Sequence, residues 1–423
     1  MKKIAKLSTR KSKVFLICVS LLTPALTQAE GTQSGATQNG ATPKSVSTLN
    51  ASNALTASAL TSLTSSNPQK DPSDSPKDPS NFKVSGYIDG SYNYVVRNKF
   101  TSGSFDRVYD TEPDGFTLQQ TGLTLGYQHS EGFGGLLTLI MGKDANGTAP
   151  YGFKPSSEFD SQTFAIDFLQ RYLQYVKGPA TIIVGRFLTL VGNEQIDPTQ
   201  DANFSRSILF YNTPDTHTGI RGIFVINDKM NLTAGVNDGW DSIRDWSRRK
   251  TVELSYSYTV NPMFSFTLTG LNGEERATPQ TDFGPEGSRT LIDLVATLNA
   301  TEKLTFVVNY DYGWQTKAAL PNGSISKAAW QGIAGYMNYK FSDQWQTSVR
   351  GEIFEDSDGF RTGVRQNWRE LTLTLGYMPI KNLQIHAETR HDFSNVNSFT
   401  RPNGKGSDNN NQSYALEAYY KFA

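Results

Sequence analysis

From residue 82 onwards, apolar and polar side chains alternate along the sequence. In the first stretch, one face collects glycine and apolar side chains: Val84, Gly86, Ile88, Gly90, Tyr92, Tyr94 and Val96. The other face is largely polar: Lys83, Ser85, Asp89, Ser91, Asn93 and Arg97. Successive side chains of a β-strand point to opposite faces, so this period of two predicts a strand. The same alternation recurs to the end of the chain and predicts an all-β fold.

The connections between the predicted strands alternate in length. Seven are short turns, at 129–132, 177–180, 227–229, 260–262, 299–303, 341–344 and 378–382. Eight are long polar loops, at 98–115, 143–160, 191–217, 238–249, 272–288, 314–328, 355–366 and 394–411. They join sixteen strands, and merging or splitting one hairpin would give about 14 or 18. Short periplasmic turns and long extracellular loops are typical of an antiparallel up-and-down β-barrel in the outer membrane.

Three features favour a transmembrane barrel over a soluble β-sandwich. The faces opposite the apolar ones carry ionisable side chains that a water-filled lumen can hold and a dry core cannot: Asp89, Arg221, Glu253, Asp293, Asp311, Lys340, Arg350, Glu352, Glu388 and Arg390. Aromatic residues flank the short turns and predict a girdle at one membrane interface: Tyr127, Phe133, Tyr258, Phe264, Phe341, Trp345 and Tyr377. The last strand alternates to Tyr420 and Phe422, which resembles a C-terminal assembly signal, although Ala423 follows.

The N-terminal 81 residues differ from the rest. Residues 1–29 contain six basic residues, no acidic residue and a central apolar run, the layout of a signal peptide cleaved after Ala29. Residues 30–81 are rich in Ser, Thr, Ala, Asn, Gly and Pro, which predicts a disordered periplasmic tether. A weak leucine-lined helix for cell-wall or self-association is the alternative. The barrel is predicted from 82 to 423, and export places it in the outer membrane of a Gram-negative bacterium.

Charge and cysteine content exclude other classes. The chain has 40 basic and 40 acidic residues, so removal of the six basic residues of 1–29 leaves 34 against 40. This balance argues against a nucleic-acid partner. The single cysteine, Cys18, lies in the predicted signal peptide, so disulfides do not hold the exported chain. No metal-ligand spacing, phosphate-binding loop or nucleotide motif is present, and no cofactor is expected.

The predicted width indicates a function. About sixteen strands leave an aqueous channel, whereas an eight-stranded barrel is filled by side chains. The third long loop, 191–217, carries four acids that would narrow the pore if it folds inward: Glu194, Asp197, Asp201 and Asp215. Arginines on the wall would then face it: Arg97, Arg221, Arg350 and Arg390. The alternative is that these acids solvate an outward loop.

Several segments resemble the OmpL-like β-barrel porin family. They are Gly122-Leu-Thr-Leu-Gly-Tyr-Gln through Glu131-Gly-Phe-Gly-Gly, Phe187-Leu-Thr-Leu through Asn203-Phe-Ser-Arg, Thr216-His-Thr-Gly-Ile-Arg, Arg289-Thr-Leu-Ile-Asp-Leu-Val-Ala-Thr and Trp330-Gln-Gly-Ile-Ala-Gly-Tyr. The resemblance covers about 82–422 and implies an outer-membrane pore for small hydrophilic solutes and ions. By analogy with sixteen-stranded porins, the expected partners include outer-membrane lipid and lipopolysaccharide, the barrel-assembly machinery and two further copies in a homotrimer.

Two other functions compete with the porin. A surface adhesin or structural barrel would bind through the long loops, but these show no tandem charge or repeated motif. An outer-membrane hydrolase would need a histidine paired with a serine or a carboxylate. Of the four histidines, His391 beside Asp392 near the outer rim is the best candidate, while His129, His217 and His386 are expected in a turn, beside a loop and in the wall. Nothing else converges on this pair, so catalysis is not predicted.

Overall fold

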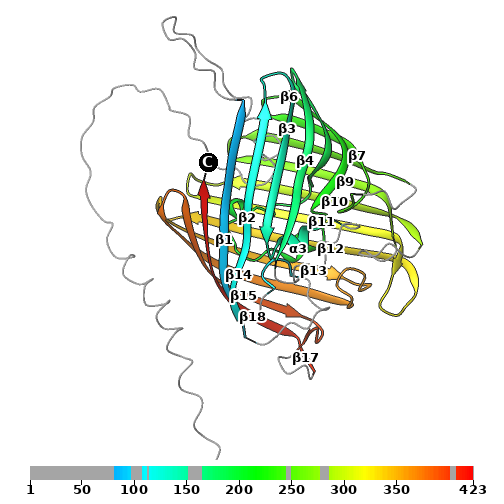
Figure 1. Ribbon diagram of the computed structural model, residues 1–423. Helices are drawn as coiled ribbons and strands as arrows, with labels where there is room; N and C mark the ends of the chain where they lie inside the picture. Colours follow the sequence, from blue (N-terminus) through cyan, green and yellow to red (C-terminus); the bar gives the residue numbers. More distant parts are fainter. Residues whose placement is uncertain are drawn as a thin grey trace, which may run out of the picture. The chain divides into compact units, whose positions relative to one another are not determined.

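The protein folds as a closed β-barrel (Figure 1). The computed structural model describes residues 81–96, 107–111, 114–150, 164–243, 249–276, 285–400 and 406–422. In chain order the barrel strands are β1 (Phe82–Val95), β2 (Asp114–Gln128), β3 (Gly132–Gly142), β4 (Ala165–Lys177), β5 (Ala180–Leu188), β6 (Thr216–Asn227), β7 (Met230–Asn237), β8 (Thr251–Asn261), β9 (Phe264–Arg276), β10 (Glu286–Asn299), β11 (Leu304–Ala319), β12 (Ile325–Lys340), β13 (Trp345–Asp356), β14 (Gln366–Ile380), β15 (Leu383–Ser394) and β18 (Asn410–Phe422). Each pairs antiparallel with its neighbours, so the predicted sixteen-stranded up-and-down barrel is confirmed.

The few other elements lie in the long connections. α3 (Ala145–Thr148) follows β3, while η1 (Pro198–Gln200) and α4 (Ile208–Tyr211) lie between β5 and β6. β16 (Phe399–Thr400) and β17 (Ser407–Asp408) pair with each other between β15 and β18. None of the described helices is long and apolar enough to cross a membrane.

The first and last strands of the barrel close the sheet. β1 pairs with β18 from Gly86 opposite Phe422 to Val95 opposite Ser413. Figure 1 shows the blue β1 and the red β18 side by side. Because an open edge in lipid would leave backbone amides without partners, this closure is what allows the sheet to span a membrane.

Two predicted loops, 272–288 and 314–328, are wrong in extent because strands β9 to β12 continue into them. The backbone ladder persists there while outward side chains become polar. Asn272, for example, donates a hydrogen bond to Thr290 Oγ1 on the neighbouring strand at 2.7 Å. The apolar half of the alternation therefore stops before the strands do, and the alternation marks the apolar band rather than the strand ends.

The alternation correctly separates the outer surface from the interior. Apolar side chains on one face of the strands are exposed, as in Ile88, Leu254, Ile333, Leu371, Leu373 and Leu416. Of the ten ionisable side chains predicted on the lumen face, nine are buried and Lys340 is exposed. A soluble sandwich would show the reverse, with its apolar face inside. This barrel presents its apolar face outward.

Part of the interior is nevertheless apolar. Strands β9 to β14 contribute a buried cluster that includes Leu271, Leu291, Val295, Val307, Trp330, Ala334, Tyr336, Phe354 and Trp368. Val191, Ile208 and Leu209, from the connection between β5 and β6, belong to the same cluster. The sequence did not reveal this interior patch, because a strand that is apolar on both faces loses its alternation.

Two inward aromatic rings lie against glycines of neighbouring strands. Gly313 is opposite Trp330, and a Cβ added to it would lie 2.2 Å from the indole ring. Gly122 is opposite Tyr87, and a Cβ added there would lie 2.4 Å from the phenol ring. Such distances are far below van der Waals contact, so only glycine leaves room for these rings.

Gly313→Ala should destabilise the barrel by about 1–3 kcal/mol, because Trp330 must leave its place in the apolar cluster. The unfolding temperature, followed by the heat-dependent mobility of the barrel on gels, measures this. Gly126→Ala is the matched control, since an added Cβ there has no neighbour within 4 Å. Equal unfolding temperatures for the two variants would show that the ring does not depend on this glycine.

Candidate functional site

The connection between β5 and β6, residues 189–215, runs through the barrel interior. Thr189 N donates to Asp215 O at 3.0 Å, so the two ends of this segment are adjacent at the wall. Between them, Asp197 Oδ1 accepts from Thr199 N at 2.9 Å and begins η1. Ser207 Oγ accepts from Phe210 N at 3.1 Å and caps α4. Side-chain caps within the segment therefore fix its local conformation, in addition to its contacts with the wall.

Two wall carboxylates hold the segment by its backbone. Glu388 on β15 accepts from Phe204 N at 2.8 Å and from Ser205 N at 3.0 Å. Glu352 on β13 accepts from Ile208 N at 2.7 Å and Leu209 N at 2.6 Å. Each carboxyl group accepts two backbone amides, one at each of its oxygens. These contacts fix the segment against the inner wall of β13 to β15.

Two wall arginines reinforce the same attachment. Arg350 on β13 donates to Glu194 Oε1 at 2.6 Å and to Ser205 O at 2.6 Å, both in the segment. Its Nε also donates to Glu370 Oε1 on β14 at 2.7 Å. Arg390 on β15 donates to the backbone oxygen of Arg206 at 2.6 Å. Arg350 thus links the segment to two neighbouring strands.

Other contacts reach the rest of this wall. Asn203 donates to Thr374 Oγ1 at 2.7 Å and accepts from Ser348 Oγ at 2.9 Å. Asn193 N donates to Asn309 Oδ1 on β11 at 3.0 Å. The three apolar residues of the segment, named above, pack on the interior cluster of β9 to β14. Polar and apolar contacts together anchor the segment from β9 to β15.

Arg206 holds the segment together internally. Its Nε lies 3.0 Å from Asp201 Oδ2 and donates to Gln195 O at 2.8 Å, while Nη1 donates to Phe204 O at 2.8 Å. Burial raises the pKa of the Asp201 carboxyl well above its usual value, and the Arg206 guanidinium opposes that rise. This pair lies within the segment and does not connect it to the wall.

The structure distributes the predicted constriction residues among different partners. Glu194 and Arg350 form a direct pair, whereas Asp197 caps η1 and Asp201 binds Arg206. The remaining residues lie elsewhere: Arg390 contacts the backbone of the segment, Arg221 pairs with Glu253 in the wall at 2.6 Å, Asp215 lines a cavity, and Arg97 lies outside the described residues. The backbone-binding role of Glu352 and Glu388 was not predicted.

The predicted girdle residues lie on strand ends next to the short turns. Tyr127, Phe133, Phe264, Phe341 and Trp345 are exposed, and Trp345 stacks on Tyr377 with ring centroids 4.4 Å apart. The remaining one, Tyr258, packs edge-on against a phenylalanine ring. This placement on the outer face is what contact with a membrane interface requires, and the girdle itself stays a prediction.

The best candidate for a catalytic pair does not assemble. His391 and Asp392 are consecutive on β15, so their side chains point to opposite faces. His391 stacks on Phe393 with centroids 4.1 Å apart, while Asp392 is buried and binds Arg390 at 2.7 Å. His386 is paired with Glu417 at 2.6 Å. Within the described part of the chain, no three His, Cys, Asp or Glu side chains are placed to share a metal ion.

A closed sixteen-stranded barrel with an apolar outside, a charged interior and an inward segment defines a porin-type channel. The family model described as "Putative beta-barrel porin-2, OmpL-like" matches residues 81–422, and the chain belongs to this family. It is an outer-membrane porin of a Gram-negative bacterium, a channel for passive diffusion. No curated protein matches the chain significantly.

Solved porins share the fold at low sequence identity. The outer-membrane channel DcaP of Acinetobacter baumannii is 12% identical, with 81% of this chain and 97% of that chain covered and a TM-score of 0.55. The anion-selective porin from Comamonas acidovorans is 10% identical, covering 81% and 99%, with a TM-score of 0.54. OmpT of Vibrio cholerae in its trimer form is 10% identical, covering 81% and 99%, with a TM-score of 0.52. At these identities the likeness concerns the fold alone.

Arg350→Met should lower the free energy of unfolding by about 3–5 kcal/mol, because Glu194 would stay buried without its cation and Glu370 would keep only Arg390, whose Nε lies 3.6 Å away. Denaturant titration of the protein in detergent, followed by tryptophan fluorescence, measures the change. The control is Arg249→Met, whose side chain is 82% exposed and lies 3.7 Å from Glu274. That surface pair should contribute less than about 1 kcal/mol. Similar losses in both variants would contradict an anchoring role for Arg350.

Proposed function

We propose that residues 189–215 form the constriction of the channel. The observation that carries this proposal is the attachment of the segment to inward-facing Glu352 and Glu388 through four backbone amides. A segment held at both ends by the wall and in its middle by these carboxylates occupies part of the lumen cross-section. Solutes then pass through the remaining space, and its width sets their size limit.

Two of the four acids of this segment are neutralised by direct ion pairs. Glu194 is paired with Arg350 at 2.6 Å, and Asp201 with Arg206 at 3.0 Å. Close pairing cancels most of the field that either charge alone would project across the pore. We therefore propose that the segment narrows the channel mainly by its volume. Substitutions that neutralise its acids would first weaken its attachment to the wall.

The same proposal covers assembly, membrane contacts and the N-terminal 81 residues. The OmpT structure named above is a trimer form, which supports a homotrimer for this barrel. Its apolar outer face fits contact with outer-membrane lipid and lipopolysaccharide. Tyr420 and Phe422, both exposed on β18, would serve the barrel-assembly machinery as a recognition signal. Residues 1–29 would direct export, residues 30–81 would act as a periplasmic tether, and no reaction would be catalysed.

Replacing residues 191–213 by a four-residue Gly-Ser linker should raise the single-channel conductance about twofold or more, because the segment no longer obstructs the lumen. The adjacent ends of the segment allow so short a linker. Conductance steps in planar bilayers measure the effect.

The control replaces residues 321–324, an exposed turn between β11 and β12, with a linker of the same length. Its conductance should equal that of the unaltered protein. If the 191–213 variant inserts as a heat-modifiable barrel and conducts no better than this control, the segment is not the constriction. If neither the variants nor the unaltered protein pass current, the open-channel function itself is wrong.

A further inference from the structure

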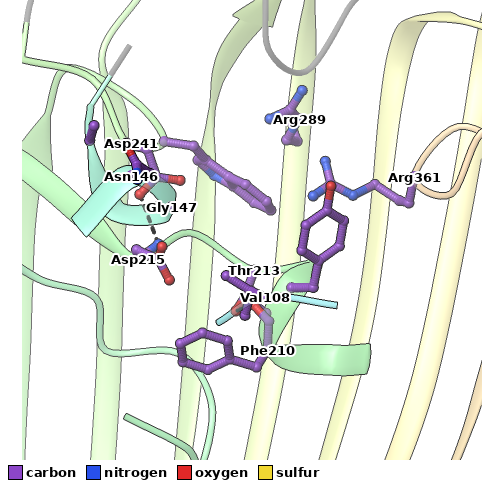
Figure 2. A pocket seen from close by; sticks show the side chains of 12 residues that line it. Val108, Asn146, Gly147, Phe210, Thr213, Asp215, Asp241, Arg289 and Arg361 are labelled. Atoms are coloured by element: carbon purple, nitrogen blue, oxygen red, sulfur yellow. Dashed lines mark hydrogen bonds between the residues drawn. The ribbon is translucent and has the colours of Figure 1, made fainter. Parts of the chain in front are cut away.

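A cavity of about 180 Å³ lies beside α4, where several long connections meet (Figure 2). The constriction segment contributes Phe210 and Asp215 to its lining, and the connection after β7 contributes Trp240 and Asp241. Arg361 comes from the connection after β13. These connections are the extracellular ones, so the cavity lies at the outer mouth of the channel.

One side of the cavity carries a guanidinium with unused donors. Arg361 donates through Nε to Asn212 Oδ1 at 3.1 Å, and its Cζ lies 5.6 Å from the Trp240 ring centroid. Within the described residues it forms no ion pair, and its two Nη groups have no acceptor. Arg289, which also lines the cavity, differs because its Nη1 lies 3.9 Å from Glu275. Figure 2 shows the side chain of Arg361 reaching toward the cavity.

The other side of the cavity carries two carboxylates, those of Asp241 and Asp215, and the acceptors of Asp215 are unused. Asp241 accepts from the backbone amides of Asp215 and Thr216, both at 2.8 Å. The side chain of Asp215 receives no hydrogen bond from any residue that the structure describes. Burial and the neighbouring Asp241 raise the pKa of the Asp215 carboxyl well above its usual value. A cationic donor placed beside Asp215 would relieve both effects.

The size and lining of the cavity limit its ligand. An engineered cavity of about 150 Å³ holds benzene, so about 180 Å³ holds a solute of roughly six to ten non-hydrogen atoms. The Phe210 and Trp240 rings also line the cavity and offer apolar surface. The complementary solute is small, carries an anionic and a cationic group, and has an apolar part.

We infer that this cavity binds small zwitterionic solutes, of the class of free amino acids, as they enter the channel. The carboxylate of the solute accepts hydrogen bonds from the Nη groups of Arg361, and its ammonium donates to the Asp215 carboxylate. The apolar side chain packs between the rings of Phe210 and Trp240. The inference rests on the proposed function, because the segment that borders the cavity is the proposed constriction.

Three probes of matched shape separate the two charges in the unaltered protein. L-leucine carries both groups, 4-methylpentanoate lacks the ammonium, and 3-methylbutylamine lacks the carboxylate. Each is added to full-length channels in a planar bilayer, and the concentration that halves the ion current is measured. Each charged group of leucine adds charge-assisted hydrogen bonds to the binding free energy. Leucine should therefore block at concentrations about tenfold lower than either fragment, and also at lower concentrations than glucose.

Substitutions then locate the effect. Arg361→Met and Asp215→Asn should each raise the half-blocking concentration of leucine about tenfold. Arg361→Lys, which keeps the charge but not the paired donors, should fall between them and the unaltered protein. The matched control is Arg365→Met, an exposed arginine of the same connection that does not line the cavity. It should leave the leucine block unchanged.

Each other result overturns the inference. Equal block by 4-methylpentanoate and leucine would identify an anion site, and equal block by glucose a sugar site. An open channel that none of the probes blocks would refute the cavity as a binding site while leaving the channel function intact. If no current flows, the proposed function fails, and calorimetric titration of leucine into the detergent-solubilised protein still decides the inference. If leucine binding gives the same heat with Arg361→Met as with the unaltered protein, leucine binds outside this cavity.

Discussion

The ladder between β1 and β18 is the interaction on which the rest of this structure depends. Strands that cross lipid must pair all their backbone amides, and only closure removes the last unpaired edge. β1 and β18 come from opposite ends of the barrel sequence, so their pairing requires the register of every other strand pair to be consistent with closure. Once closed, the sheet separates an apolar outside from an enclosed interior. The interior then follows rules different from those of a soluble core.

The interior of a membrane barrel can hold ionised side chains because water can enter it. Glu352, Glu388 and Arg350 are inward-facing and would be costly in an apolar core. The 189–215 segment supplies them with amides, carbonyl oxygens and a carboxylate, so each buried charge acquires a partner when the segment folds inward. The charged wall and the inward segment therefore stabilise each other. Neither would be expected to be well ordered without the other.

The strands and the orientation of their faces could be predicted from the sequence, because neighbouring residues of a strand lie on opposite faces and differ in polarity. The strand ends could not, since the ladder outlasts the apolar band near Asn272. The anchoring of the inward segment could not be predicted either. Phe204 and Glu388 are 184 residues apart, and Ile208 and Glu352 are 144 apart. Glutamates that bind backbone amides leave no pattern of side-chain types. Among the described contacts between the segment and the wall, Glu194 with Arg350 joins an acid and an arginine that were both predicted for the constriction.

The charged side chains inside the barrel fall into two groups, those that are paired and stabilise the structure and those that remain available to solutes. Arg350 has its donors used by Glu194, Glu370 and Ser205, so a passing solute would have to break existing bonds to reach it. Arg361 binds Asn212 through its Nε and has two nitrogen groups without acceptors among the described residues. A charge that is fully paired stabilises the barrel and is neutral toward solutes. A charge left unpaired at the channel mouth adds little to stability and can discriminate among solutes. We therefore propose that solute selectivity in this porin depends on its unpaired charges, while the paired ones hold the proposed constriction in place.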